Sequence, residues 1–396
     1  MTSTTQPAND QGTGPRLRGN LGTLELFFSI MAYNAPLVVV VGIIPIMLVA
    51  GNGVGTPLVF IISGIILAAF ADGFIRMSKA LPRPGAFYSF ITAGLGREVG
   101  LGSGFTMLVA YFCVASGTVA FGGIVLGALV TDTLHGPSAP WYVWGAVFWG
   151  LTAVLGYLRI DLSAKITTLL LFGELVVVAV YDTAVILHGG GPDDLSAAPF
   201  SPAHLFDGSF AIGILFAMGM FGGFEVAVLF RDEVRDPRRA IPRATFGVIA
   251  AAGVLYSVTS WLFIDSLGVG NAVASVLADP EGVMHASISE FAGRFTTDAA
   301  NVLVNTSAFA VLLTAHNVAS RYVFNLSADG ILPRALSGVH QRHGSPHAAS
   351  LAMSVATAVI FVPIVVLDVE PLAFYAAILG IASVATLAVF FAATSR

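Results

Sequence analysis

The stretch that decides the fold is FFSIMAYNAPLVVVVGIIPIML, residues 27–48. It is apolar and long enough to cross a bilayer as a helix, which needs about 20 residues. Asn34 and Pro36 nevertheless stand in its middle. Because Pro36 has no amide hydrogen and crowds the preceding turn, this stretch predicts a membrane helix that breaks near residue 35.

A second apolar stretch, ILFAMGMFGGFEVAVLF at 214–230, is interrupted in a similar way. Gly219, Gly222 and Gly223 come just before Glu225, and each glycine weakens a helix by about 1 kcal/mol relative to alanine. Glycine and proline in membrane helices often serve only close packing or kinks. Two breaks, each beside a polar residue, indicate instead a binding site near the middle of the membrane.

The composition of the chain limits its class. Of its 396 residues, 56% are hydrophobic and 10% are charged, whereas soluble domains carry about 25% charged residues. These values exclude soluble globular, collagen-like, disordered and nucleic-acid-binding proteins. The single Cys113 cannot form an internal disulfide. The chain is therefore expected to be a polytopic membrane protein embedded in a lipid bilayer.

Ten stretches have the length and apolarity of membrane helices, and the period-two pattern of a membrane β-barrel is absent. The predicted spans are about 24–49, 57–77, 100–130, 140–158, 164–188, 209–230, 244–268, 299–327, 348–367 and 371–393. The two breaks fall in the first and sixth spans. A half with five spans begins and ends on opposite sides of the membrane. The second half therefore starts from the other side, and the two halves have inverted orientations. The sequence predicts an all-α membrane protein made of two inverted five-helix repeats.

The distribution of basic residues predicts the orientation. With the N-terminus in the cytoplasm, 17 of the 18 Lys and Arg residues fall in or beside cytoplasmic segments, and Arg294 lies outside. We expect a multi-pass protein of the cell (plasma) membrane. Residues 1–20 are expected to form a disordered cytoplasmic tail, and 21–396 a single transmembrane domain with no appended enzyme.

A broken helix exposes backbone N–H groups at the start of its second half and carbonyl groups at the end of its first half. Amides near Tyr33, Asn34 and Ala35 would receive a carboxylate. Carbonyls near Ile30, Gly219 and Gly222 would receive an ammonium group. This pair of sites suits a zwitterion such as an amino acid, whereas an amine or polyamine would use only the carbonyl half.

Four segments resemble the amino acid–polyamine–organocation permease superfamily. The match is carried by FGGFEVAVLFRDEVRDPRRAIPRA at 221–244, by NVASRYVFNLSADGILPRALSGVHQRHGSPHAA at 317–349, by LPRPGAFYSFITAGLGR at 81–97 and, more loosely, by the first span. The resemblance implies substrate binding around both breaks. It also implies that the Phe221 ring occludes the substrate.

The chain departs from the family pattern in two places. The first break is usually glycine-rich in this family, but Ala32, Tyr33, Asn34 and Ala35 occupy it here. Most relatives have twelve spans, so a ten-span chain is either a natural short form or truncated. Tyr33 and Asn34 would narrow the site or contact the substrate directly. We therefore expect the substrate-binding residues to be Ile30, Ala32, Tyr33, Asn34, Ala35, Gly219, Phe221, Gly222 and Gly223.

Two glutamates are candidates for ion or proton coupling. An ionisable side chain within a span is costly to bury in the membrane, so its presence there indicates a function. Glu174, within LLLFGELVVV at 169–178, could carry a proton or bind a cation with Thr314 as partner. Alternatively, it is a protonated, hydrogen-bonded acid that only holds neighbouring helices together. Glu225 could act in gating or proton relay, or it could simply cap the broken sixth helix.

The sequence thus predicts a secondary active amino acid permease, working by alternating access as a proton symporter or an exchanger. The alternatives are a polyamine or amine permease and a transport-inactive ligand-binding sensor or subunit. The partners expected are a small-molecule substrate and a proton or sodium. No constellation of an intramembrane enzyme, no cofactor motif and no metal-ligand spacing is found. The identity of the substrate and the oligomeric state stay open.

Overall fold

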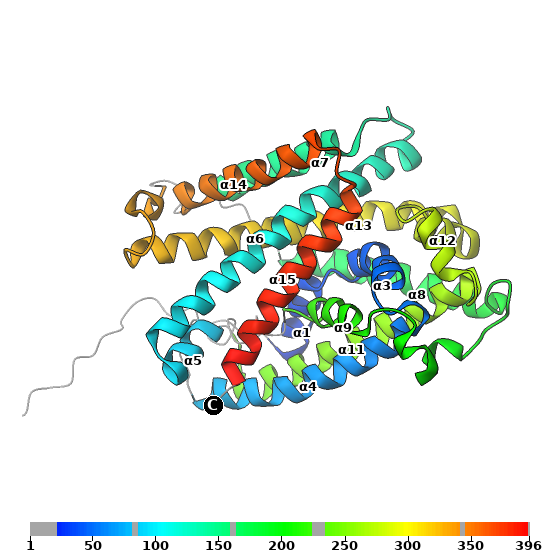
Figure 1. Ribbon diagram of the computed structural model, residues 1–396, viewed down its shortest axis with the longest axis horizontal. Coiled ribbons are helices and arrows are strands. Elements are labelled where there is room, and N and C mark those ends of the chain that lie inside the picture. The colour runs from blue at the N-terminus through cyan, green and yellow to red at the C-terminus, as the bar shows by residue number, and fades with distance from the viewer. Residues whose placement is uncertain (1–21, 81–85, 159–163, 224–233, 341–344, 395–396) are drawn as a thin grey trace, which may run out of the picture.

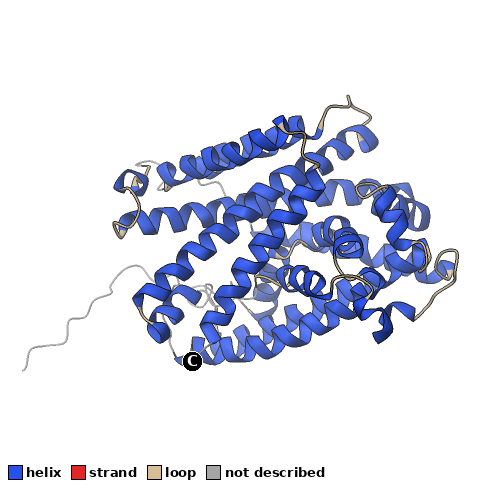
Figure 2. Cartoon of the chain, viewed as in Figure 1, coloured by secondary structure: helices blue, strands red, loops and turns tan. Residues whose placement is uncertain are grey.

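The computed structural model describes residues 22–80, 86–158, 164–223, 234–340 and 345–394. Within these ranges the chain is helical with short connections, and it contains no strand (Figure 2). The predicted tail at 1–20 lies outside the described residues. The first four elements are α1 (Thr23–Tyr33), α2 (Pro36–Val38), the π-helix η1 (Val39–Ile43) and α3 (Ile44–Ala50).

The other elements follow in chain order. They are η2 (Gly53–Gly55), α4 (Thr56–Ala80), α5 (Ala86–Leu95), α6 (Arg97–Ala128), η3 (Leu129–Thr133), α7 (Trp141–Leu158), α8 (Ala164–His188), η4 (Ala198–Phe200), η5 (Pro202–Phe206), α9 (Phe210–Met220), α11 (Pro237–Leu267), α12 (Ala272–Ala278), α13 (Val283–Ala328), η7 (Arg334–Ser337), α14 (His347–Val366) and α15 (Pro371–Thr394).

Nine helical segments of the described chain are long and apolar enough to cross a membrane, and they correspond to nine of the ten predicted spans. The sixth predicted span, 209–230, is described only as far as Gly223. Its described part is the 11-residue helix α9, which is too short to cross alone. Helix α9 therefore represents the first half of a broken span.

The segments between spans contain more helix than the sequence indicated. Helix α5 lies between the second and third spans, and α12 lies in the segment predicted as the outer loop 269–298. The same loop also holds the start of α13, which Gly293, with φ 80°, separates from the span that follows. Val283, Met284 and Ile288 are buried there, so the segment folds back onto the protein.

Packing places the first span at the centre of the molecule. Every residue from Pro36 to Leu48 is buried, whereas α7, α8 and α14 expose much of their surface. Helix α6 packs against both α13 and α15 on one side of it, and α4 packs against α9 and α11 on the other (Figure 1). A broken helix inside a membrane needs such protein surroundings, because lipid cannot satisfy freed backbone groups.

Candidate functional site at the two helix breaks

The first span breaks where the sequence predicted. Helix α1 ends at Tyr33, Ala35 takes a left-handed conformation with φ 46°, and α2 begins at Pro36. Left-handed backbone is unfavourable for a residue with a side chain, so the surrounding fold must hold it in place. The proline prevents the first helix from continuing across this point.

The backbone amides at this break are not free, which corrects one expectation. The amide of Asn34 donates to the carbonyls of Ile30 and Met31, at 3.3 and 3.1 Å, and that of Ala35 donates to Ala32 at 3.2 Å. The carbonyl predicted to be free near Ile30 is also in use. The reason is that the chain closes α1 with a tight turn instead of unwinding over several residues.

Glu174 caps the second half of the broken span. Its Oε2 accepts a hydrogen bond from the amide of Leu37 at 3.0 Å, and its side chain is 3% exposed. A carboxylate is favourable at a helix N-terminus, where unpaired amides carry partial positive charge. Ser307 on α13 and Tyr256 on α11 both lie close enough to interact with this carboxyl group.

Thr314 was expected to be the partner of Glu174 on the eighth span. The residue of α13 that interacts with the carboxyl group is Ser307, two helical turns earlier. The role of Thr314 as a partner of Glu174 in binding a cation stays a prediction. The α13 helix faces α8 along several turns, so hydropathy alone could not say which turn meets Glu174.

The second break follows α9 directly. The chain turns at Phe221–Gly223, the amide of Gly222 donates to the carbonyl of Gly219 at 3.2 Å, and Gly223 has φ 96°. A Cβ at Gly223 would collide with Cδ1 of Tyr33 and would lie 3.2 Å from Oδ1 of Asn34. The two breaks therefore touch each other, and they can do so only because Gly223 lacks a side chain. Glu225 lies outside the described residues.

A cavity of about 130 Å³ lies at this junction. It brings together six of the residues predicted to bind substrate, which are Tyr33, Asn34, Ala35, Gly219, Gly222 and Gly223. Ile30 and Ala32 do not line it, and Ile30 is fully buried in α1 packing. Among the described residues that line the cavity, none carries a charged side chain.

The cavity is completed by residues that the sequence did not single out. Tyr111 and Thr118 of α6, Val311 of α13, and Tyr375 and Leu379 of α15 line it from the other side. These residues sit within ordinary apolar stretches, and no local pattern distinguishes them from packing residues. Only the position of α6, α13 and α15 around the first span brings them to the cavity.

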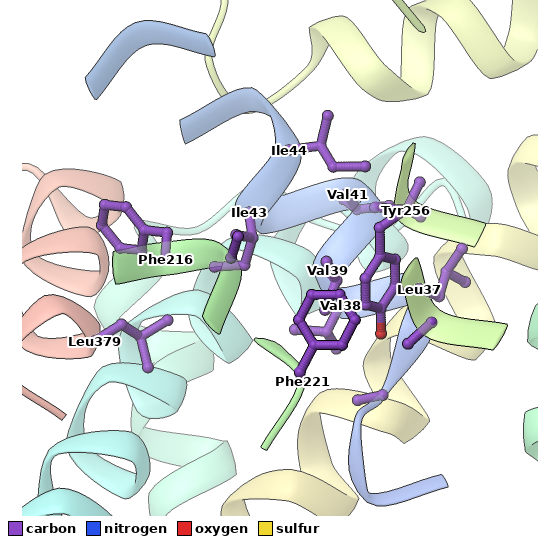
Figure 3. Packing of buried hydrophobic residues seen from close by; sticks show 14 of the residues in the cluster. Leu37, Val38, Val39, Val41, Ile43, Ile44, Phe216, Phe221, Tyr256 and Leu379 are labelled. Atoms are coloured by element: carbon purple, nitrogen blue, oxygen red, sulfur yellow. The ribbon is translucent and has the colours of Figure 1, made fainter. Parts of the chain in front are cut away.

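Phe221 lies behind the cavity. Its ring is completely buried, and it packs edge-on against Phe60, with centroids 6.4 Å apart, and against Tyr256, at 6.3 Å. Figure 3 shows it beside Tyr256 and Val38. Gly64 of α4 and Gly253 of α11 lie next to this ring. Phe221 does not line the cavity in this conformation, and its role as an occluding residue stays a prediction.

A larger cavity of about 380 Å³ lies one helical turn away, along the first span, α6 and α15. Val41, Phe121 and Leu372 line it, whereas Val38, Thr118 and Tyr375 line the cavity at the breaks. The rings of Phe121 and Tyr375 stack between the two, with centroids 4.8 Å apart and planes 17° from parallel. This aromatic pair therefore lies between the two cavities.

Comparison with known proteins now identifies the family. The profile of the family described as amino acid permease matches residues 27–395, which is nearly the whole chain. The chain belongs to the amino acid permease family. The predicted resemblance to the superfamily is thereby confirmed.

Individual relatives are distant. The branched-chain amino acid permease BcaP of Bacillus subtilis (strain 168) is 23% identical over 319 residues, which cover 75% of this chain. The aromatic amino acid transport protein AroP of Escherichia coli (strain K12) is 25% identical over 321 residues, which cover 74%. The chain spans 65% of the length of both relatives.

The fold is also found in a solved structure. The crystal structure of MhsT in complex with L-phenylalanine matches with a TM-score of 0.51 at 16% identity, covering 87% of this chain and 80% of that one. At this identity the likeness shows the fold alone. It confirms the predicted architecture of two inverted five-helix repeats with broken first and sixth helices.

Proposed function

We propose that this chain is a secondary transporter that carries an amino acid across the cytoplasmic membrane by alternating access. The observation that carries the proposal is the meeting of the two helix breaks at one small cavity. Interrupted helices that meet near the membrane midplane form the substrate sites of inverted-repeat transporters. The family assignment and the names of the relatives support an amino acid as the substrate class.

The lining of the cavity favours a neutral, apolar amino acid. Apart from Asn34, the threonines and the tyrosine hydroxyls, the lining is aliphatic, aromatic or glycine, and none of it is charged. Its volume of about 130 Å³ is close to that of the apolar protein cavity of about 150 Å³ known to hold benzene. Because this space must also hold the α-amino and α-carboxylate groups, an apolar side chain suits it better than a charged or very bulky one.

Glu174 is the residue that we propose to couple transport to protons. As a carboxylate it fits the N-terminus of α2, where it holds the Leu37 amide and ties α8 to the first span. Protonation would remove that charge and weaken the link between the two elements. A sodium ion suits this position poorly, because the amide end of a helix repels cations.

Uptake into proteoliposomes tests both parts of the proposal. Labelled leucine, phenylalanine, alanine and putrescine are offered with an inward proton gradient, with a sodium gradient and with neither. We expect a proton gradient to drive accumulation of a neutral amino acid. In Glu174→Gln we expect exchange of internal for external substrate to persist while gradient-driven accumulation falls to the level without a gradient.

The matched control is Asp182→Asn, an equally conservative change at another buried acid of α8, which hydrogen-bonds Thr259 at 2.9 Å. We expect this variant to retain accumulation driven by a proton gradient. Accumulation that followed only the sodium gradient would contradict proton coupling. Thermal stabilisation by an amino acid without any uptake would support the ligand-binding sensor instead.

A further inference from the structure

The side chain of Asn34 has no hydrogen-bond partner among the described residues. Its Nδ2 and Oδ1 are both buried, and the residue is 8% exposed, yet neither atom is bonded to any group in the described chain. Leaving a buried polar group unpaired costs about 1–3 kcal/mol. Asn34 lines the cavity, and its Oδ1 lies against Gly223 of the second break. The carboxamide thus stands unpaired at the point where the two breaks meet.

The backbone donors around Asn34 are already occupied. The amides of Asn34 and Ala35 donate to carbonyls of α1, Pro36 has no N–H, and the amide of Leu37 donates to Glu174. No backbone amide from residue 34 to residue 37 is therefore left for a carboxylate. The position that a substrate carboxylate would take at the N-terminus of α2 is held by the carboxylate of Glu174.

The threonine hydroxyls of the cavity are committed as well. Thr118 Oγ1 donates to the carbonyl of Val114 at 2.7 Å, and Thr386 Oγ1 donates to that of Ala382 at 2.9 Å. Each donation stays within the threonine's own helix. Asn34, in contrast, offers both a donor and an acceptor to the cavity, and either orientation of its amide offers the same pair.

We infer that the Asn34 side chain, rather than the backbone of the first span, receives the α-amino and α-carboxylate groups of the substrate. Nδ2 donates to the carboxylate, and Oδ1 accepts from the ammonium group beside Gly223. The inference rests on the proposed function and deepens it, because it makes an amino acid with both groups free the substrate class. A ligand that lacks either group uses only half of the carboxamide.

The substitution Asn34→Asp tests this arrangement, because it keeps the shape and the acceptor but replaces the donor by a negative charge. Thermal stability is measured with L-leucine and L-phenylalanine and with 3-methylbutylamine and phenethylamine, which lack the carboxylate. Wild type is expected to prefer the amino acids. In Asn34→Asp we expect affinity for the amino acids to fall by roughly tenfold to a hundredfold, the effect of one charge-assisted hydrogen bond, while amine binding is retained or strengthened.

Asn52→Asp is the matched control, since Asn52 is fully buried and unpaired in the same way but does not line the cavity. It should keep the wild-type preference for amino acids. If Asn34→Asp does not fold, Asn34→Ala should weaken binding of both ligand types. Unchanged amino acid affinity in the Asn34 variants would overturn the inference while leaving the proposed function intact. Failure of wild type to bind any amino acid would overturn the proposed function itself.

Discussion

At the scale of single residues, the contact between the two breaks depends on Gly223. Its φ of 96° is a conformation that residues with a side chain rarely adopt, and the Tyr33 ring occupies the space that a Cβ would need. A substitution at this position must therefore both strain the backbone and push the two halves of the site apart. The same backbone position sets the distance between Asn34 and the second break.

We expect Gly223→Ala to destabilise the protein by at least about 1–3 kcal/mol, the cost of one strained backbone position. Thermal unfolding in detergent checks this, and ligand-dependent stabilisation should be lost in the same variant. Gly150→Ala is the control, because its added Cβ would meet no described heavy atom within 4 Å. It should be neutral or stabilising by up to about 1 kcal/mol. A Gly223→Ala protein as stable as wild type would refute the close contact.

At the scale of elements, the π-helix η1 packs through Gly42 against Phe121 of α6. A Cβ on Gly42 would lie 2.7 Å from Cε2 of Phe121, and Phe121 stacks in turn on Tyr375. π-helical turns are rare and frequently mark functional positions. Here the turn directly follows the first break, so the Phe121–Tyr375 pair packs against the same irregular segment that forms the site.

Gly42→Ala should therefore destabilise the protein by about 1–3 kcal/mol through overpacking. Because the added methyl group meets the Phe121 ring, the double variant Gly42→Ala with Phe121→Leu should recover part of that loss. A double-mutant cycle of thermal unfolding measures the coupling. Strictly additive effects of the two substitutions would mean that Gly42 and Phe121 do not share this contact.

At the scale of the whole molecule, connecting segments gather at two opposite ends. Helix α5 and the start of α14 lie at one end, and α12 and the chain after α8 lie at the other (Figure 1). The predicted spans place 17 of the 18 Lys and Arg residues in or beside the segments at the end that carries α5. We therefore propose that this end faces the cytoplasm.

Cysteine labelling in intact cells tests that orientation. In a Cys113→Ala background, Leu195→Cys should react with a membrane-impermeant maleimide added outside, whereas Ala335→Cys should react only after the membrane is opened. Both positions are exposed, so access to the reagent depends on the side of the membrane. The reverse labelling pattern would invert the proposed topology and the direction of alternating access.

The membrane class, the approximate spans and the position of both breaks could be derived from the sequence by itself. Hydropathy depends on residue type, and the breaks at Pro36 and at Gly222–Gly223 follow from the backbone chemistry of those residues. Six of the predicted site residues meet at one cavity for the same reason, since the breaks define it.

The tertiary structure alone decided which polar groups are free. The carboxylate of Glu174 reaches the amide of Leu37 across 137 residues of sequence, and Ser307 of α13 lies close to it. Phe221 packs behind the cavity, while Tyr111 and Tyr375 line it. Hydrogen-bond partners and cavity walls depend on how distant helices pack, and a local pattern of residue types carries no information about that packing.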